Sequence, residues 1–217
     1  MKVYHFLSER YGLEAIRKRY LKISLFQSLN DPFEWAAPAG AMARERAAFE
    51  KMKDEMSKDR GILCFSRSWH NPLLWSHYAD KHRGICLGFE LADDIANKVN
   101  YRRTRVPCDW IKFYADFDYR FLIMEQVLLT KFSHWRYENE IRAMVALDHS
   151  TERNGLYFYD FGKDMPLTEV IVGSVSSLSR NDIDQALGQN IAVKRRKARL
   201  AFRSFKVVEQ RKASLWK

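Results

Sequence analysis

Apolar and polar residues alternate along this chain in short runs that predict both strands and helices. Runs with a two-residue period, or short apolar stretches, predict strands at Val3–Leu7, Lys22–Leu29, Ile62–Phe65, Gly84–Phe89, Glu140–Leu147, Gly155–Tyr159 and Thr168–Gly173. Apolar residues three and four apart, with capping residues, predict helices after Ser8, over residues 41–58, 72–82, 91–97 and 114–132, and from Ser179 to about Gly188. Because the connections are short and irregular, the pattern predicts a single α+β domain over residues 1–217, with mixed, mostly antiparallel sheets and flanking helices.

One predicted strand–helix–strand unit is crowded with Trp, His and Tyr. Asn71 is a favourable N-cap, Pro72 suits the first helical position, and Gly84 can take the left-handed conformation that ends a helix. Trp75 and Tyr78 lie on this short helix between two apolar strands. This combination predicts a functional site.

The phrase NDPFE predicts another helix start. Asp31 would be the N-cap, Pro32 the first helical residue, and Glu34 the second member of a capping-box-like pair. A local role of this kind would explain the phrase without a site.

The longest apolar run, Phe113–Phe132, is interrupted by Asp116, Asp118, Arg120 and Glu125 and predicts a core helix rather than a membrane span. Its inward stripe is predicted to be Phe117, Phe121, Met124 and Leu128. The N-terminal residues lack the apolar stretch of a secretory signal. We therefore expect a cytoplasmic protein with no membrane partner.

Charge is concentrated in the basic C-terminal segment, residues 194–217. This segment holds ten basic residues and one acidic residue, a net charge of +9 out of +10 for the whole chain of 217 residues. Such a block attracts phosphates, so nucleic acid is a candidate partner. A solvated face, or an edge strand protected by its charges, is the alternative interpretation. The candidate nucleic-acid-binding residues are Arg195, Arg196, Arg199 and Arg203, with Phe202 and Phe205 for stacking.

Several common chemistries have no motif in this sequence. The three cysteines form no CxxC pair and no HExxH is present, so no metal site is expected. The chain also lacks GxGxxG, a P-loop and the GxSxG nucleophile elbow. Cys64 lies in an apolar strand, which predicts an inert buried thiol.

The phrase WRYENEIR carries the second candidate site. As a strand, it would direct Arg136, Glu138, Glu140 and Arg142 to one face. The two carboxylates would then lie roughly 7 Å apart. They are either a catalytic pair or part of a self-neutralising row of surface charges.

The chain resembles an uncharacterised bacterial family through NDPFE, PLLWSHYADKHRGICLGF (Pro72–Phe89), WRYENEIR and EVIVG (Glu169–Gly173). More distantly, the E-x-E of WRYENEIR is similar to the catalytic signature of ADP-ribosyltransferases, which use NAD as co-substrate. The order of candidate residues also resembles that superfamily: a first-strand His5, a middle Ser66 and Tyr78, and the late Glu138 and Glu140.

That resemblance implies a set of roles. Glu140 would hold the nicotinamide ribose and Glu138 would assist the acceptor. Tyr78 or Trp75 would stack on the nicotinamide ring, while His5 would bind the adenosine ribose and Ser66 would brace the glutamate. His5 and Tyr78 as ordinary core residues remain the alternative.

The predicted function is therefore an ADP-ribosyltransferase-like enzyme. It would be a toxin or phage-defence effector acting on nucleic acid or an associated target, with an antitoxin or other partner protein. Two alternatives remain open: a non-catalytic nucleic-acid-binding module, and a metal-independent nuclease-like effector that uses His and Glu as acid and base.

Overall fold

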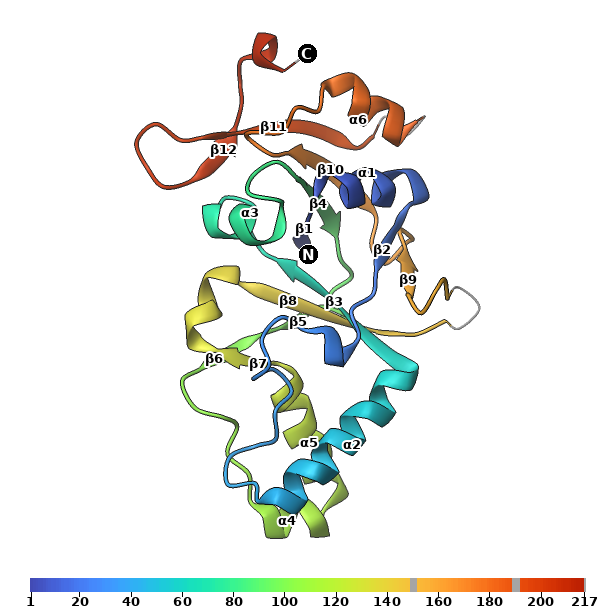
Figure 1. Cartoon of the computed structure of the whole chain (residues 1–217), viewed down its shortest axis with the longest axis vertical. Helices are drawn as coiled ribbons and strands as arrows, with labels where there is room; N and C mark the ends of the chain where they lie inside the picture. Colours follow the sequence, from blue (N-terminus) through green and yellow to red (C-terminus); the bar gives the residue numbers. More distant parts are fainter. Residues whose placement is uncertain (149–151, 189–191, 217) are drawn as a thin grey trace.

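One eight-stranded sheet runs through the protein (Figure 1). The computed structural model describes residues 1–148, 152–188 and 192–216. The strand order is β12-β11-β10-β4-β1-β3-β8-β5, and every neighbouring pair is antiparallel except β10 and β11. The strands are β1 (Lys2–Leu7), β3 (Arg60–Ser66), β4 (Ile85–Glu90), β5 (Asn97–Lys98), β8 (Glu140–Ala146), β10 (Leu167–Val172), β11 (Lys194–Leu200) and β12 (Val207–Glu209). The predicted single α+β domain with a mostly antiparallel sheet is confirmed.

Two short strand pairs and the helices surround this sheet. β2 (Tyr20–Lys22) pairs with β9 (Phe158–Asp160), and β6 (Asn100–Arg102) pairs with β7 (Thr130–Phe132). The α-helices are α1 (Glu9–Lys18), α2 (Ala43–Asp59), α3 (Pro72–Tyr78), α4 (Trp110–Ala115), α5 (Phe117–Leu128) and α6 (Arg180–Leu187). The short 3₁₀ helices are η1 (Phe26–Ser28), η2 (Ser133–Glu138) and η4 (Ala213–Leu215).

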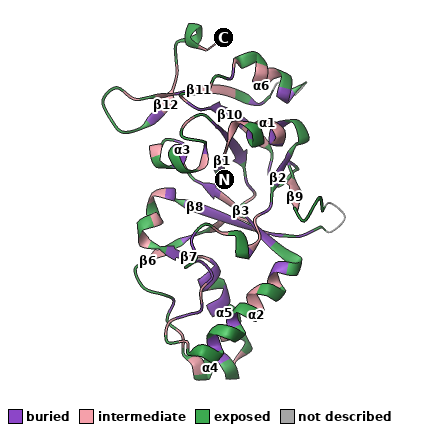
Figure 2. Ribbon diagram, viewed as in Figure 1, coloured by how far each residue is buried: buried purple, intermediate pink, exposed green. Residues whose placement is uncertain are grey.

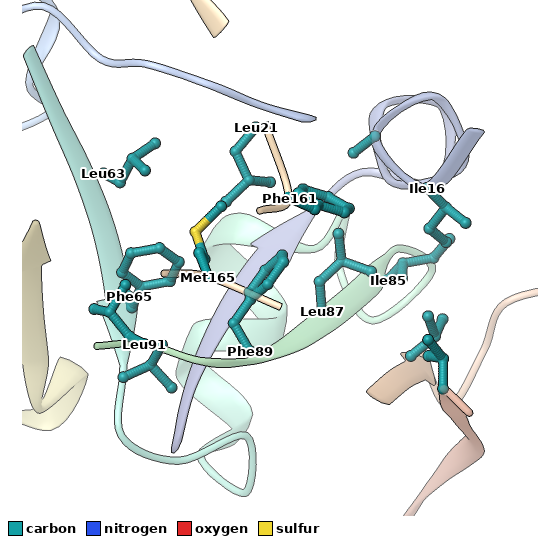
Figure 3. Close-up of a cluster of buried hydrophobic side chains, with 14 of the residues drawn as sticks. Ile16, Leu21, Leu63, Phe65, Ile85, Leu87, Phe89, Leu91, Phe161 and Met165 are labelled. Carbon is teal, nitrogen blue, oxygen red and sulfur yellow. The ribbon is translucent and has the colours of Figure 1, made fainter. Parts of the chain in front are cut away.

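Side-chain alternation along the strands divides the core between the two faces of the sheet. On β3, Leu63 and Phe65 face the cluster beneath α1 and α6, whereas Ile62 and Cys64 face the cluster formed with α2 and α5. Figure 3 shows the first cluster, in which the Phe65 and Phe89 ring centroids lie 6.0 Å apart. A third cluster, around Trp75, packs α3 against the second face of the sheet.

The sheet is split between β1 and β3. β1 pairs with β4 along its whole length, but it pairs with β3 only at Tyr4 and Ser66. The next contact between the two strands is made by the side chain of His5, whose Nδ1 lies 2.8 Å from the carbonyl oxygen of Cys64. On the second face, the α3 cluster covers one side of the split and the α2–α5 cluster covers the other. A gap between two helical layers therefore opens at the split.

The alternation of basic and apolar residues over 192–209 predicts a hairpin, and the structure forms one there from β11 and β12, at the end of the sheet. Figure 2 shows that the central strands are buried while the connection between β11 and β12 is exposed. The strands predicted at Val3–Leu7, Ile62–Phe65, Gly84–Phe89, Glu140–Leu147 and Thr168–Gly173 are also confirmed, as are the helices after Ser8, over residues 41–58 and after Ser179.

The helix predicted over residues 72–82 is shorter than expected. Asn71 caps it as predicted, with its side chain accepting from the backbone of Leu73 at 3.0 Å. The helix ends at Tyr78, and residues 80–82 all have positive φ, from 43° to 70°. Gly84 is not the left-handed cap, because its φ is not positive. A Cβ at this position would collide with the carbonyl oxygen of Leu7. Close approach to β1 is the physical reason for this glycine.

The prediction of one long helix over residues 114–132 is wrong. Asp116 ends α4 and caps α5, accepting from the backbone of Tyr119 at 3.0 Å, so two shorter helices replace one. Phe117 and Phe121 are exposed, and only Met124 and Leu128 of the predicted stripe are buried. The cap changes the helix axis and with it the buried face.

Four other local predictions differ from the structure. Residues 22–29 contain the end of β2 and the 3₁₀ helix η1 rather than one strand. Residues 91–97 contain a turn and the first residue of β5 rather than a helix. Strand pairing in the stretch predicted at Gly155–Tyr159 begins only at Phe158. NDPFE starts no helix, because Asp31 accepts from Phe33 within a turn.

WRYENEIR is only half a strand. Residues up to Glu138 belong to η2, Asn139 is left-handed with a φ of 46°, and β8 begins at Glu140. Asparagine tolerates this conformation better than most residues. The turn, rather than strand alternation, brings Glu138 back beside Glu140.

Candidate functional site

A polar cavity of about 200 Å³ lies at the split between β1 and β3. Five of the residues predicted from sequence line it: His5, Ser66, Tyr78, Glu138 and Glu140. They come from β1, β3, α3, η2 and β8, which are well separated along the chain.

Lys131 organises the acidic wall of this cavity. Its ammonium nitrogen lies 2.6 Å from Glu138 Oε2, 3.1 Å from Glu140 Oε2 and 3.2 Å from Glu34 Oε1. An ammonium group has three N–H donors, so each donor meets one carboxylate. Burial opposes ionisation of Lys131, but the three carboxylates outweigh it and raise its pKa.

Arg142 completes the network from β8. Its Nε donates to Glu140 Oε1 at 2.8 Å, its Nη1 donates to the carbonyl of Leu128 at 2.6 Å, and its Nη2 pairs with Glu34. The side chain is 0% exposed. A buried charge of this kind persists only when it is paired, and each of these contacts is with an acceptor.

The two glutamates of E-x-E have different environments. Glu140 accepts three hydrogen bonds, two from Arg142 and one from Lys131. Burial opposes its ionisation, but Arg142 and Lys131 outweigh that effect and lower its pKa. Glu138 accepts one bond from Lys131 and one from the Tyr78 hydroxyl at 2.5 Å. Burial dominates there and raises the pKa of Glu138.

A carboxylate offers about four acceptor positions. Glu138 therefore keeps two of them, whereas Glu140 is close to saturated and its backbone N–H is also held by the hydroxyl of Tyr101 at 2.8 Å. Of the two, Glu138 is the carboxylate with capacity for a ligand.

Tyr78 connects α3 to this acidic wall. Its hydroxyl bonds Glu138, and the Asn71 side chain at the start of α3 donates to the carbonyl of Tyr137 at 2.9 Å. Both ends of the helix are thus tied to η2. Tyr78 is half-buried at the cavity edge, so its ring is available to a ligand as well as to the core.

His5 and Ser66 line the cavity with part of their polar capacity already in use. A backbone carbonyl only accepts, so His5 donates its Nδ1 proton to Cys64, which leaves Nε2 as an acceptor. Burial lowers the pKa of His5 and keeps it neutral. The Ser66 hydroxyl donates to the carbonyl of Ser68 at 3.0 Å and does not bond a glutamate.

Trp75 does not line the cavity. Its side chain is fully buried, packs edge-to-face on Phe6, and donates its indole N–H to the carbonyl of Trp69 at 2.6 Å. The sequence could not separate Trp75 from Tyr78 as a ligand-stacking residue. Its place on α3 puts it in the core.

The predicted nucleic-acid-binding arginines fall into two groups. Arg195 pairs with Asp184 at 2.7 Å, and Arg196 pairs with Glu169 and Glu209. Arg199 and Arg203 form no ion pair in the described residues and line a groove at the β11–β12 hairpin, which Arg196 also lines. The Arg199 guanidinium lies 4.7 Å from the Phe202 ring centroid.

Burial raises the pKa of the Cys64 thiol, as expected for an inert cysteine. Within residues 1–148, 152–188 and 192–216, no three His, Cys, Asp or Glu side chains gather so as to hold a metal ion. In the same part of the chain, no helix is long and apolar enough to cross a bilayer.

Sequence reasoning missed Glu34 and Lys131. Glu34 looked like a capping residue because NDPFE has the spacing of a helix start. Lys131 follows an apolar run, and a lysine in that setting needs a buried partner. This apolar setting was the only local indication that Lys131 is buried, and it did not identify the carboxylates that pair with it.

These features define an α+β protein with an acidic, ion-paired cavity at a split in its sheet. Residues 74–143 match a family described as a protein of unknown function, DUF2971. The matching segment includes Tyr78, Lys131, Glu138, Glu140 and Arg142, whereas NDPFE and EVIVG lie outside it. No curated protein and no solved structure matches the chain.

Proposed function

We propose that this protein is an ADP-ribosyltransferase-like enzyme that cleaves the bond between nicotinamide and ribose of NAD in this cavity. The observation that carries the proposal is the convergence of His5, Tyr78, Glu138 and Glu140, from four separate elements, on one cavity. The ADP-ribosyltransferase resemblance supplies the chemistry. Glu138, with free acceptor positions, takes the role at the sugar that the resemblance gave to Glu140.

Local charge favours a cationic ligand. Glu34, Glu138 and Glu140 face Lys131 and Arg142, so three carboxylates meet two cations and one negative charge remains. The nicotinamide ring of NAD is cationic, and positive charge moves to the ribose as the bond breaks. A carboxylate fixed beside that sugar stabilises the transition state more than the ground state.

The reaction step follows from these positions. The bond between ribose C1′ and the ring nitrogen breaks, and its electron pair leaves with neutral nicotinamide. The Glu138 carboxylate stabilises the cationic C1′. A water molecule or acceptor group then bonds to C1′ and gives its proton to Glu138. His5 Nε2 is an acceptor at the same cavity and can bind a ligand hydroxyl.

The volume of the cavity limits which part of NAD can bind inside it. Pockets for drug-sized ligands are typically about 300–1,000 Å³. The cavity of about 200 Å³ is smaller, so we assign to it only the nicotinamide ring and its ribose. The rest of the dinucleotide lies outside.

The same charges argue against the nuclease-like alternative. A nuclease must bind a phosphate anion at its reacting centre, but both cations at this cavity are already paired with carboxylates. A net negative charge opposes a phosphodiester there.

The test is release of nicotinamide from NAD labelled in its nicotinamide ring. Wild-type protein should release labelled nicotinamide with water alone as acceptor. Tyr78→Phe removes the hydroxyl that orients Glu138, and we expect it to lower kcat/KM about 10-fold. Tyr137→Phe is the matched control, because the Tyr137 hydroxyl has no hydrogen bond in the described part of the chain. No release above the protein-free blank would exclude the proposal.

A second candidate function, nucleic-acid binding, is favoured by one specific observation at the hairpin. Phe202 and Phe205 are 92% and 98% exposed, and Phe202, Arg199 and Arg203 line the hairpin groove of about 690 Å³. Exposed aromatics beside arginines suit a single strand, because bases stack on rings while guanidiniums contact phosphates. This surface is a candidate for holding the acceptor.

For that candidate we expect single-stranded DNA or RNA to bind with an affinity that falls steeply with salt. Phe202→Ala should weaken binding roughly 10- to 100-fold, and Arg203→Ala should reduce the salt slope by about 1. Arg195→Ala is the control, because Arg195 is paired with Asp184. Fluorescence anisotropy over a salt series measures all three, and equal losses in all three would contradict a defined site.

A further inference from the structure

A second pocket, of about 520 Å³, lies beside the first on the outer side of Lys131. Lys131 lines both spaces, and the 31–36 loop separates them, with Glu34 at the acidic cavity and Phe33 and Trp35 at this pocket. Its volume lies within the range of about 300–1,000 Å³ that small-molecule sites occupy. Neither E-x-E nor the basic hairpin contributes to it.

The charge of this pocket is the reverse of the cavity's. Arg102, Arg103 and Arg105 line it, and no acidic side chain is among the described residues that do so. Arg105 donates to the carbonyl of Ala37 at 3.2 Å, whereas Arg102 and Arg103 make no ion pair in residues 1–148, 152–188 or 192–216. Exposed guanidiniums of this kind suit phosphate, which they bind in bidentate fashion.

The floor and rim of the pocket are apolar. Val106 and Val127 are buried at its floor, while the rings of Phe33 and Phe132 are 69% and 44% exposed. The pairing of β6 with β7 places Arg102 directly beside Phe132. Exposed rings next to a free guanidinium offer a stacking surface for a flat ring with a phosphate attached.

Trp35 adds an unusual feature to the pocket wall. Its backbone is left-handed, with a φ of 57°, which sends Glu34 into the acidic network and Trp35 towards Phe26 and Phe49. Its indole N–H is buried and has no partner among the described residues. A strained residue with an unsatisfied donor is more frequent at functional sites than elsewhere.

We propose that this pocket binds a nucleotide, with its base against Phe33 and Phe132 and its phosphates on Arg102 and Arg103. The assignment does not rest on the reaction proposed above. Two sources share this chemistry: the distal half of the dinucleotide whose reactive end lies in the acidic cavity, and a separate nucleotide. Because the 31–36 loop and Lys131 belong to both walls, occupancy of the pocket bears directly on the acidic network.

The test is isothermal titration of the full chain with ADP. We expect saturable binding of one ADP per chain, weakened at least 10-fold when Arg102→Ala and Arg103→Ala are combined. Both side chains are exposed and make no ion pairs in the described residues, so the fold should tolerate their loss. Phe33→Ala should weaken ADP while leaving the weaker binding of pyrophosphate unchanged. Arg17→Ala, which removes the same charge from the exposed surface of α1, is the matched control and should bind ADP like wild type.

Several results would overturn this assignment. They are the absence of saturable ADP binding, unchanged binding in the double variant, equal weakening by Arg17→Ala, and pyrophosphate binding as tight as that of ADP. The two sources separate in the nicotinamide-release assay. ADP that raises KM for NAD without changing kcat identifies the distal half of the dinucleotide, whereas ADP that leaves KM unchanged identifies a separate nucleotide. A protein that binds ADP through Arg102 and Arg103 but never cleaves NAD would retain this inference and exclude only the proposed reaction.

Discussion

Arg142→Met should lower the free energy of unfolding by about 3–5 kcal/mol, the usual cost of removing one partner from a buried ion pair. The guanidinium is fully buried and meets Glu34, Glu140 and the carbonyl of Leu128. Met has a similar stem length, so the loss is mainly electrostatic: Glu34 and Glu140 keep their charges without their main cation. For a chain of this size, the melting temperature should fall by roughly 6–20 °C.

The matched control is Arg195→Met. Arg195 also lies on a strand and pairs with one carboxylate, but its partner Asp184 is half exposed. An exposed pair contributes about 0–1 kcal/mol. Combining Arg142→Met with Glu140→Gln should cost less than the two single changes together, because the second change removes a charge that the first leaves unpaired. A melting temperature for Arg142→Met within about 2 °C of wild type, well below the shift expected for a chain of this size, would mean that the network does not hold the fold.

Glu138→Gln and Glu140→Gln should separate activity from stability. We expect Glu138→Gln to lower kcat/KM for nicotinamide release by about 100- to 10,000-fold, the range for a positioned acid–base group. Its effect on stability should be small, because the carbonyl oxygen of the new amide can accept from Lys131 while the amide N–H donates to the Tyr78 hydroxyl oxygen.

The amide of Glu140→Gln cannot satisfy its neighbours in this way. Both carboxylate oxygens of Glu140 accept from fixed donors on Arg142 and Lys131, so an amide NH₂ there must face another donor. A buried unsatisfied group costs about 1–3 kcal/mol. Thermal melts and the release assay on both variants, with the exposed Glu50→Gln as control, measure the difference. Full activity in Glu138→Gln would exclude its role at the sugar.

The pH profile of nicotinamide release is an independent test of the role of Glu138. Burial raises the pKa of Glu138 in the free protein, and the reaction needs its ionised form. Activity should therefore fall on the acid side at a pH above the usual glutamate range near about 4.3. The acid limb should disappear from the residual activity of Glu138→Gln. The pH dependence of stability comes from Glu140 instead. Because the pKa of Glu140 is lowered in the folded protein, the stability that its ionised form provides is present above the unfolded pKa and is lost as the pH falls through the folded pKa.

Sequence patterns predicted the features that depend on near neighbours. Asn71 and Ser179 cap helices because capping needs only a side chain and the next turn of backbone. Glu140 and Arg142 share a face because strand alternation is local. His5, Ser66 and Tyr78, which the sequence named as candidates, line one cavity in the structure.

What the sequence by itself determined is therefore a set of strands, caps and a basic hairpin, together with a pair of glutamates close to the start of a late strand. The tertiary structure decided which charges meet. Glu34 and Arg142 are 108 residues apart, and a local pattern places Glu34 equally well in a helix cap. It also decided that Trp75 is core while Tyr78 reaches the cavity. Ion pairing inside a protein depends on desolvation and distance, and both are fixed only when distant segments pack together.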